Sequence, residues 1–497
     1  MSTNELFGRN PWLAGLQYWE NYMRALGRYA DDFTKQTMQA GKRFQVVEER
    51  RARDRTGEEN HELYWKLIHL SNRQYNTGMS ASLNAGLRFH TQQFWGFMRS
   101  MYTGNGLRFL EDQSRALEVL ASFDKLIADV EPEFGFHFDD GNYRRDDETP
   151  RSILYQVWPY INGETRYDLV NESLKPIVIV PPHVLGANIL CFLRNHGKSY
   201  VHSFANKRIP TYVRIMKPIN KTPAVARMTQ EDDCLDTKYF CEKVARRHGR
   251  MVSLNGYCQA GYGAVVNWLS GMLDDSVDAV ITCVAPMDGT LSRGLSTFLK
   301  DFPPEFNDLA YGGEKVSSGE GMSLVYKLKS LDNQAPFVAF INDLQMVLKA
   351  LRDGGKLSLT VPALHRWLYV DRVDIPRGIT KVSFDSYNTP ITADGTLPVR
   401  LFGKKLNLGR FKEKGCTLAN FYAPKDDLVE QEVALAAKKW ATFVEEMEGG
   451  HVKKATSPFQ KEGGPERFHL GLAHTPVDIS LLSQRLLHYR ESRGGVN

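Results

Sequence analysis

The residue with the clearest chemical potential is Cys258, in the segment GYCQAG at residues 256–261. A β-branched run over residues 250–257 predicts a strand that enters this segment. A helical pattern over residues 259–272 follows at once. A strand, a tight turn and a helix form the context of a nucleophile elbow, whose central side chain projects at the helix N-terminus. The sequence therefore predicts Cys258 as a nucleophile.

The neighbours of the cysteine fit such a turn. The residues two before and two after it must be small, and they are Gly256 and Ala260, while Gly261 lets the helix approach the strand. The helix dipole stabilises a thiolate at this position, and the amide of Gln259 would be one oxyanion donor. The alternative is a glycine-rich turn around a buried structural cysteine.

Two further residues complete a possible catalytic triad. A predicted strand at 416–423 is followed by Asp426, and a predicted strand at 441–446 leads to a glycine pair and His451. The order nucleophile, acid, histidine is that of the α/β-hydrolases. We therefore predict that His451 is the general base and that Asp426 orients it.

Two other carboxylates compete for the role of the acid. Asp427 adjoins Asp426, and Asp288 follows the predicted strand 278–285. We prefer Asp426 because its D-x-L-V pattern is similar to the D-x-[IV]-V run that follows the usual acid. Asp427 is the second choice, and Asp288 is also interpreted as a turn or pocket residue.

The rest of the chain supplies the elements that must position these groups. Residues 1–130 predict an N-terminal helical region, and the acidic, Gly- and Pro-bearing residues 131–150 predict a linker. Residues 151–475 predict an α/β domain with a mostly parallel sheet flanked by helices. An insertion at about 290–410 is typical of a cap over an active site. Residues 476–497 predict a C-terminal amphipathic helix.

Within the α/β domain, strands and helices are expected to alternate. The β-branched runs predict strands at 176–182, 199–205, 250–257, 278–285, 416–423 and 441–446. Helical patterns lie between most of them, at 187–196, 236–247, 259–272 and 429–440. Inside the insertion, much of 317–372 predicts helix, and 380–411 predicts loops and a hairpin.

Composition excludes several classes of protein. The 497 residues are 42% hydrophobic and 24% charged, which is typical of globular proteins and excludes a disordered chain and a coiled-coil rod. A net charge of +5 is too weak to predict a nucleic-acid partner. Six cysteines without a C-x-x-C pair, and a start (MSTNELFGRN) without an apolar run, predict a soluble, cytoplasmic protein.

Four segments resemble the polyhydroxyalkanoate synthases, which are Cys-dependent members of the α/β-hydrolase superfamily. VPPHV at 180–184 resembles the family's V-P-P-x-[IV], and GYCQAG at 256–261 resembles its G-x-C-x-G-G box. DDLV at 426–429 stands where the family has D-H-I-V, and GHV at 450–452 resembles its G-H-[IV]. The resemblance implies an α/β-hydrolase fold, and it implies that the loop amides of His183 and Val184 complete the oxyanion hole.

The sequence also departs from this family. The histidine beside the family's acid is Asp427 here, the tryptophan that follows is missing, and the second elbow glycine is Ala260. The family's cap is hard to align with residues 290–410. These departures leave the cysteine chemistry intact but put polymerisation in doubt.

The resemblance implies an acyltransferase that takes an acyl group from a (3-hydroxy)acyl-CoA onto Cys258 and passes it to a hydroxyl. With water as acceptor the protein would be a thioesterase, and a Cys hydrolase of another ester and a non-catalytic scaffold are further alternatives. CoA enters as substrate, and no bound cofactor or metal is expected. The N-terminal helices are interpreted as a packed domain or dimer surface, or else as a docking surface for a granule or membrane.

Overall fold

A computed structural model of the chain describes residues 11–184, 186–294, 316–317, 336–352, 358–458 and 463–473. These residues fall into two compact units. The first unit comprises the described residues 11–132, 336–352 and 358–372. The second comprises 133–184, 186–294, 316–317, 373–458 and 463–473. The predicted C-terminal helix at 476–497 lies outside the described residues.

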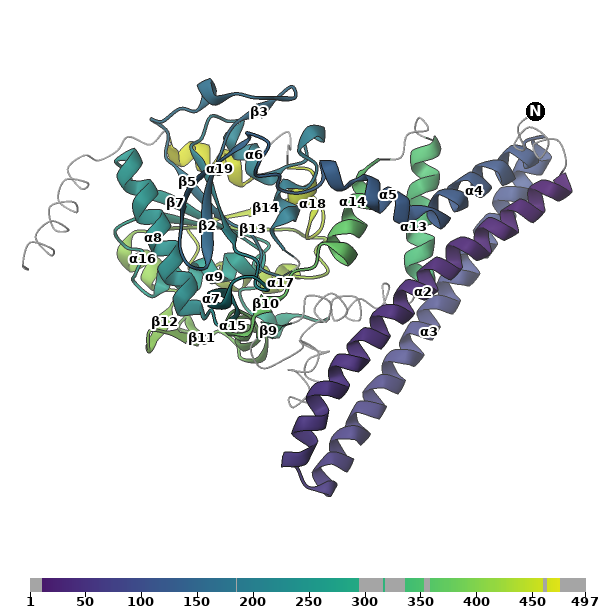
Figure 1. The fold of residues 1–497 in the computed structure, drawn as a ribbon, viewed down its shortest axis with the longest axis horizontal. Helices are drawn as coiled ribbons and strands as arrows, with labels where there is room; N and C mark the ends of the chain where they lie inside the picture. The colour runs from purple at the N-terminus through teal and green to yellow at the C-terminus, as the bar shows by residue number, and fades with distance from the viewer. Residues whose placement is uncertain are drawn as a thin grey trace, which may run out of the picture. The chain divides into compact units, whose positions relative to one another are not determined.

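The described part of the second unit is built around an eight-stranded sheet of order β1-β2-β6-β5-β7-β8-β13-β14 (Figure 1). The first two strands and β6 pair antiparallel, and every later pair from β6 to β14 is parallel. This confirms the predicted mostly parallel sheet and the α/β-hydrolase fold. The strands are β1 (Tyr143–Glu148), β2 (Ser152–Val157), β5 (Ile177–Val180), β6 (Thr211–Met216), β7 (Val252–Tyr257), β8 (Val277–Cys283), β13 (Thr417–Tyr422) and β14 (Phe443–Glu446).

Helices cover both faces of this sheet. Alternate residues of a strand point to opposite faces, and on β7 Leu254 packs into the main core while Asn255 accepts a hydrogen bond from Tyr200 of α6. The helices of this unit are α6 (Tyr200–Ala205), α7 (Pro223–Ala226), α8 (Gln230–His248), α9 (Gln259–Leu269), α15 (Arg377–Asn388), α16 (Arg410–Lys414), α17 (Gln431–Ala434), α18 (Lys453–Thr456) and α19 (Pro465–Ala473).

Short elements decorate the second unit. The two-stranded pairs are β3 (Tyr160–Ile161) with β4 (Glu164–Thr165), β9 (Val316–Ser317) with β10 (Ile375–Pro376), and β11 (Thr396–Leu401) with β12 (Lys404–Asn407). The short 3-10 helices of this unit are η3 (Tyr167–Leu169), η4 (Ala187–Cys191), η5 (Arg194–His196), η6 (Gly289–Leu291) and η8 (Leu435–Ala437), and η2 (Glu131–Glu133) spans the boundary between the two units. The hairpin β11–β12 confirms the one predicted within 380–411.

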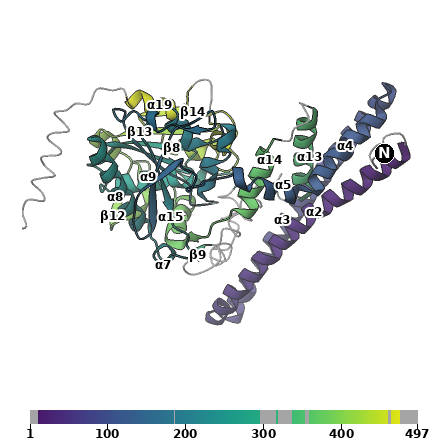
Figure 2. The same ribbon diagram turned by 45° about the horizontal axis from the view of Figure 1, so that its top comes forward.

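The first unit is helical in its described residues, as predicted for the N-terminal region. Figures 1 and 2 show its two longest helices running side by side. The elements are α2 (Pro11–Arg51), η1 (Ala52–Asp54), α3 (Gly57–Tyr102), α4 (Gly106–Ala121), α5 (Phe123–Asp129), α13 (Pro336–Arg352), α14 (Thr360–His365) and the π-helical turn η7 (Arg366–Val370). Among the described residues, none of the helices combines the length and the apolar character needed to cross a membrane.

Part of the predicted cap belongs to this first unit. Phe340 and Leu344 of α13 are fully buried in one core with Tyr22 of α2, Phe89 of α3 and Leu117 of α4. Asp343 of the same helix binds side chains from two other helices: its Oδ2 lies 2.5 Å from Oη of Tyr29 on α2 and 2.8 Å from Nε2 of His365 on α14. Residues 336–352 and 358–372 therefore complete the helical unit, although the sequence analysis places them in the α/β domain.

Three of the predicted local structures differ from those observed. Residues 143–148, inside the predicted linker, form the edge strand β1, because they pair with β2. Residues 199–205 were predicted as a strand but form α6, because the hydroxyl of Ser199 caps the helix by accepting from the amide of His202. Residues 380–388, which lie in the stretch 380–411 expected as loops and a hairpin, form most of α15.

Candidate active site

Cys258 stands in a strained turn between β7 and α9. It has φ 55° and ψ −127°, a conformation that a residue with a side chain rarely adopts. Its amide donates to the carbonyl of Cys283 at 2.8 Å, and its own carbonyl accepts from the amide of Gly261 at 2.9 Å. The thiol therefore sits at the N-terminus of a helix of 11 residues, where the dipole favours negative charge. This is the geometry predicted for a nucleophile elbow.

The glycines of the turn are required by close backbone contacts. A Cβ on Gly256 would lie 2.3 Å from the carbonyl oxygen of Ala260, and one on Gly261 would lie 2.7 Å from the Cβ of Ala285. The residue two after the cysteine tolerates its own methyl group, since Ala260 is 3% exposed and packs in the core. The replacement of the second elbow glycine by Ala260 is thus compatible with the turn.

The histidine and the preferred acid lie together. Nδ1 of His451 donates to Oδ2 of Asp426 over 2.7 Å, and the Asp426 side chain is fully buried. The other carboxylate oxygen accepts from the amides of Leu428 and Val429 at 2.9 and 2.8 Å. These bonds fix the carboxylate at the end of β13 and leave Nε2 of His451 for the thiol.

His451 interacts electrostatically with both Asp426 and Cys258. Burial lowers the pKa of His451, but the charges of Asp426 and Cys258, with hydrogen bonds to both, raise that pKa well above its usual range. The protonated form of the imidazole is therefore favoured beside the sulfur of Cys258. The structure thus brings Cys258, His451 and Asp426 into one chain of contacts.

The two rival acids are not in this chain. Asp427 is exposed to solvent. Asp288 is buried, but one of its oxygens accepts from the amide and hydroxyl of Thr290 and the other from the amide of Ile391. Asp288 therefore fixes the loop after β8, as the turn interpretation of this residue expected.

The remaining cysteines differ from Cys258 in burial. All six cysteines of the chain are free thiols in described residues, and Cys258 alone among them is partly exposed. Burial raises the pKa of Cys234 and of Cys283 to about 12. Burial also raises the pKa of the thiols of Cys191, Cys241 and Cys416. Thiols held neutral in this way are poor nucleophiles.

The sequence analysis missed a contact that holds the histidine loop. The hydroxyl of Tyr257 donates to the carbonyl of His451 over 2.7 Å, and the two rings meet edge to face with centroids 6.3 Å apart. Tyr257 directly precedes the cysteine, so one turn of chain carries both the thiol and an anchor for its partner. The sequence shows an aromatic residue before the elbow cysteine, but it does not show that the hydroxyl of this residue binds a carbonyl 194 residues away in the chain.

The oxyanion loop follows β5. The two prolines at 181 and 182 have no N–H, so the next donors are the amides of His183 and Val184. The amide of Val184 donates to Oε1 of Gln259 at 3.2 Å. In the part of the chain that the structure describes, the amide of His183 has no acceptor. The amide of Gln259 belongs to the first turn of α9 and has no acceptor within the helix.

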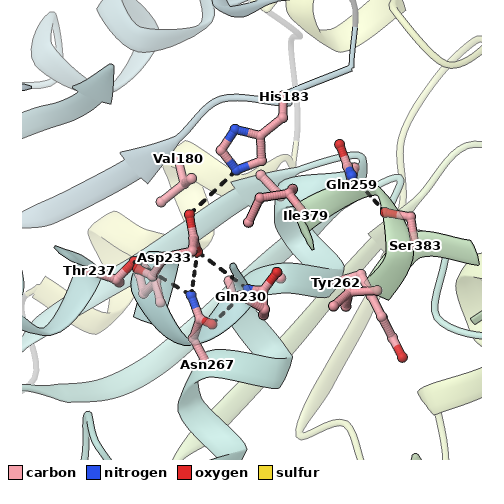
Figure 3. Close-up of a pocket in the computed structure, with 15 residues that line it drawn as sticks. Val180, His183, Gln230, Asp233, Thr237, Gln259, Tyr262, Asn267, Ile379 and Ser383 are labelled. Atoms are coloured by element: carbon pink, nitrogen blue, oxygen red, sulfur yellow. Dashed lines mark hydrogen bonds and ion pairs between the residues drawn. The ribbon is translucent and has the colours of Figure 1, made fainter. Parts of the chain in front are cut away.

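A small cavity lies behind this loop (Figure 3). It measures about 10 Å³, room for about one water molecule. Asp233 at the start of α8 is its charged centre: Oδ1 lies 3.5 Å from Nε2 of His183, and Oδ2 accepts from Asn267 at 2.7 Å (Figure 3). The guanidinium of Arg214 also binds Asp233. Burial raises the pKa of Asp233, and the charge of Arg214 more than offsets this, so that the pKa is well below its usual range.

No metal site stands out in the described ranges, where no three His, Cys, Asp or Glu side chains gather in a way that could hold an ion. No known family model matches the chain, and no curated protein matches it either.

Solved structures resemble the chain at low identity. A membrane phospholipase A, described as a bacterial virulence factor, is 10% identical with a TM-score of 0.35, and the match covers 74% of this chain and 94% of that one. A peroxisomal α/β-hydrolase of Saccharomyces cerevisiae is 10% identical with a TM-score of 0.33, covering 72% and 100%. A monoacylglycerol lipase of Paleococcus ferrophilus is 11% identical with a TM-score of 0.33, covering 67% and 99%.

Proposed function

We propose that the protein is a cysteine-dependent acyltransferase, similar to the polyhydroxyalkanoate synthases, that forms an acyl-Cys258 intermediate from an acyl-CoA. The observation that carries the proposal is the chain of contacts from Cys258 through His451 to Asp426 at a nucleophile elbow. A thiolate nucleophile suits a thioester substrate, because the acyl-enzyme is itself a thioester of similar energy.

The proposed reaction has two half-reactions. The thiolate of Cys258 attacks the acyl carbonyl, and the oxyanion accepts from the amide of Gln259 and an amide of the 183–184 loop. The S–C bond to CoA breaks, and the CoA sulfur takes the proton from His451. A hydroxyl then attacks the acyl-enzyme, His451 accepts its proton, and the thiolate of Cys258 is released.

The identity of the acceptor separates the candidate functions. A 3-hydroxyacyl unit as acceptor extends a polyester, another hydroxyl gives a simple ester, and water gives a thioesterase. A Cys hydrolase of an ester other than a CoA thioester is the further candidate.

The test is intact-protein mass spectrometry after incubation with 3-hydroxybutyryl-CoA and longer homologues, with a thiol reagent to follow free CoA. We expect one acyl adduct per chain in the wild type and none in Cys258→Ala. A ladder of adducts indicates a synthase, and turnover to free acid indicates a thioesterase. No adduct and no CoA from any acyl-CoA would contradict the proposal and favour another ester substrate or a scaffold.

We also propose that the helical unit docks on a lipid or polyester surface. Large apolar side chains are exposed along α2 and α3 in the described residues, far more than isolated surface residues would require; among them are Trp12, Trp19, Trp65, Phe94 and Trp95. Sedimentation with phospholipid vesicles or polyhydroxybutyrate beads should fall when Trp12, Trp19 and Trp65 are replaced by Glu. Unchanged sedimentation of that variant would contradict the docking.

A further inference from the structure

The two candidate loop donors differ in what they already bind. Val184 is 6% exposed, and its amide is engaged by Oε1 of Gln259 at 3.2 Å. His183 is 9% exposed, and its amide has no acceptor among the described residues. A buried amide needs a partner, so the Gln259 carbonyl satisfies Val184 and leaves the amide of His183 to a ligand.

The side chain of Gln259 is fixed at both ends. Its Nε2 donates to the hydroxyl of Ser383 on α15 over 2.6 Å (Figure 3). Its Oε1 accepts from the amide of Val184 in the loop. The side chain is 7% exposed, so these bonds are made away from bulk water. One side chain at the start of α9 thus ties the loop after β5 to α15.

A second contact holds the loop through the ring of His183. Nε2 of His183 lies 3.5 Å from Oδ1 of Asp233, which Arg214 and Asn267 hold in turn. The loop is therefore attached on one side through the ring of His183 and on the other through the amide of Val184. The two attachments hold the side chain and the carbonyl side of His183, and so fix the Cα that carries its free backbone amide.

We propose that the side chain of Gln259 is a positioning residue that holds this loop so that the amide of His183, and not that of Val184, donates to the oxyanion. The amide of Gln259 is the second donor, so one residue supplies a donor from its backbone and orients the other through its side chain. This inference rests on the proposed acylation of Cys258.

The test compares two reactions of the same thiol. Acylation by 4-nitrophenyl butyrate passes through an oxyanion, whereas alkylation by iodoacetamide is a direct displacement that forms none. Gln259→Met keeps the length of the side chain and removes the carbonyl that binds Val184. We expect it to slow acylation about 10- to 100-fold and to leave the alkylation rate within about two-fold, since the thiol itself is untouched.

Two variants on α15 grade the effect. Ser383→Ala removes only the far partner of Gln259, and it should slow acylation less than Gln259→Met does. Ser386→Ala, whose hydroxyl bonds only within the helix, serves as the matched control and should react as the wild type.

The outcomes separate the inference from the function beneath it. Unchanged acylation in Gln259→Met would overturn the positioning role, and faster acylation would do so too, since it would make the side chain an obstacle in the oxyanion site. An equal loss of acylation and alkylation would also overturn it, because that pattern marks a damaged thiol site. Absence of a Cys258-dependent nitrophenolate burst in the wild type would overturn the proposed acylation itself, and the inference with it.

Discussion

Asp426 is the residue whose replacement separates orientation from structure. Its Oδ1 accepts from two backbone amides and its Oδ2 from His451. In Asp426→Asn the amide oxygen can keep the backbone bonds, which turns the NH₂ group toward Nδ1 of His451 and reverses the tautomer. We expect acylation to fall about 10³- to 10⁴-fold, measured as the nitrophenolate burst. Asp427→Asn is the matched control and should keep wild-type activity, because Asp427 is exposed.

The same variant makes a prediction about pH. The pKa of His451 is raised in the folded protein, against burial, by Asp426 and Cys258. A raised folded-state pKa contributes stability that is fully present below the unfolded value of about 6.5 and is lost as pH rises through the folded value. The destabilisation by Asp426→Asn should therefore be larger at pH 6 than at pH 9, by about 1.4 kcal/mol for each tenfold change in proton affinity. Urea unfolding at both pH values measures it, and a penalty that grows with pH would refute this account.

Tyr257 allows the histidine loop to be tested without touching the triad. Tyr257→Phe keeps the ring and removes the bond to the carbonyl of His451. We expect a loss of about 1 kcal/mol in the free energy of unfolding and slower acylation. Tyr262→Phe is the matched control: its buried hydroxyl has no partner among the residues that the structure describes, so its removal should be neutral or stabilising. Equal effects of the two substitutions would deny a role for the Tyr257 hydroxyl.

At the scale of single residues, the sequence predicts those functional groups that lie in short recognisable motifs. Cys258 and His451 lie in short runs with small neighbours, and these runs indicate a turn before any contact is known. The contacts of Tyr257, Asp233 and the Gln259 side chain are not predictable in this way, because each joins segments distant in the chain. Their residue types alone indicate only buried or helix-starting positions.

At the elbow, close contacts between backbone atoms decide which residues the turn can accept. A Cβ on Gly256 would lie 2.3 Å from the backbone oxygen of Ala260, which cannot move without opening the turn. Gly256→Ala should therefore cost about 2–4 kcal/mol. Gly263→Ala on α9 is the matched control: its Cβ would meet Gln230 at an ordinary 3.5 Å, and alanine favours helix. Urea unfolding compares the two, and similar stabilities would show that the turn tolerates a side chain.

Local patterns predicted some elements and not others. The runs at β5, β7, β8 and β13 are short, apolar and bounded by turn residues, which is why the central strands were found. The strands β2 and β6 were not predicted; β6, TYVRIM, buries Arg214 against α8 and so lacks a plain apolar run. In α6 an apolar run that suggests a strand is overruled by the cap at Ser199.

At the scale of the whole molecule, the chain divides differently from the order of its sequence. The sequence separates residues 1–130 from an insertion at 290–410, but α13 packs with α2, α3 and α4 in one core. A cap inserted after a core strand is expected to cover the active site. The amphipathic pattern of its helices shows that one face is buried, but it does not identify the surface against which that face packs. The division into units follows from packing that no local pattern contains.

This packing predicts that the N-terminal helices cannot be removed alone. Deletion of residues 1–130 would expose Phe340, Leu344 and Val347 of α13, all fully buried in the whole chain. Exposing each side chain of this size costs about 1.5–3 kcal/mol of folding free energy. Isolated helices of this length are only marginally stable in water, so they cannot offset this loss. We expect limited proteolysis to cut the truncated chain within 336–372, while the full chain is protected there. Phe340→Ala in the full chain should give partial cleavage at the same sites, because it removes one buried ring and leaves the neighbouring contacts. A truncated chain that resists proteolysis over 336–372 would show that these helices find their fold without the N-terminal region.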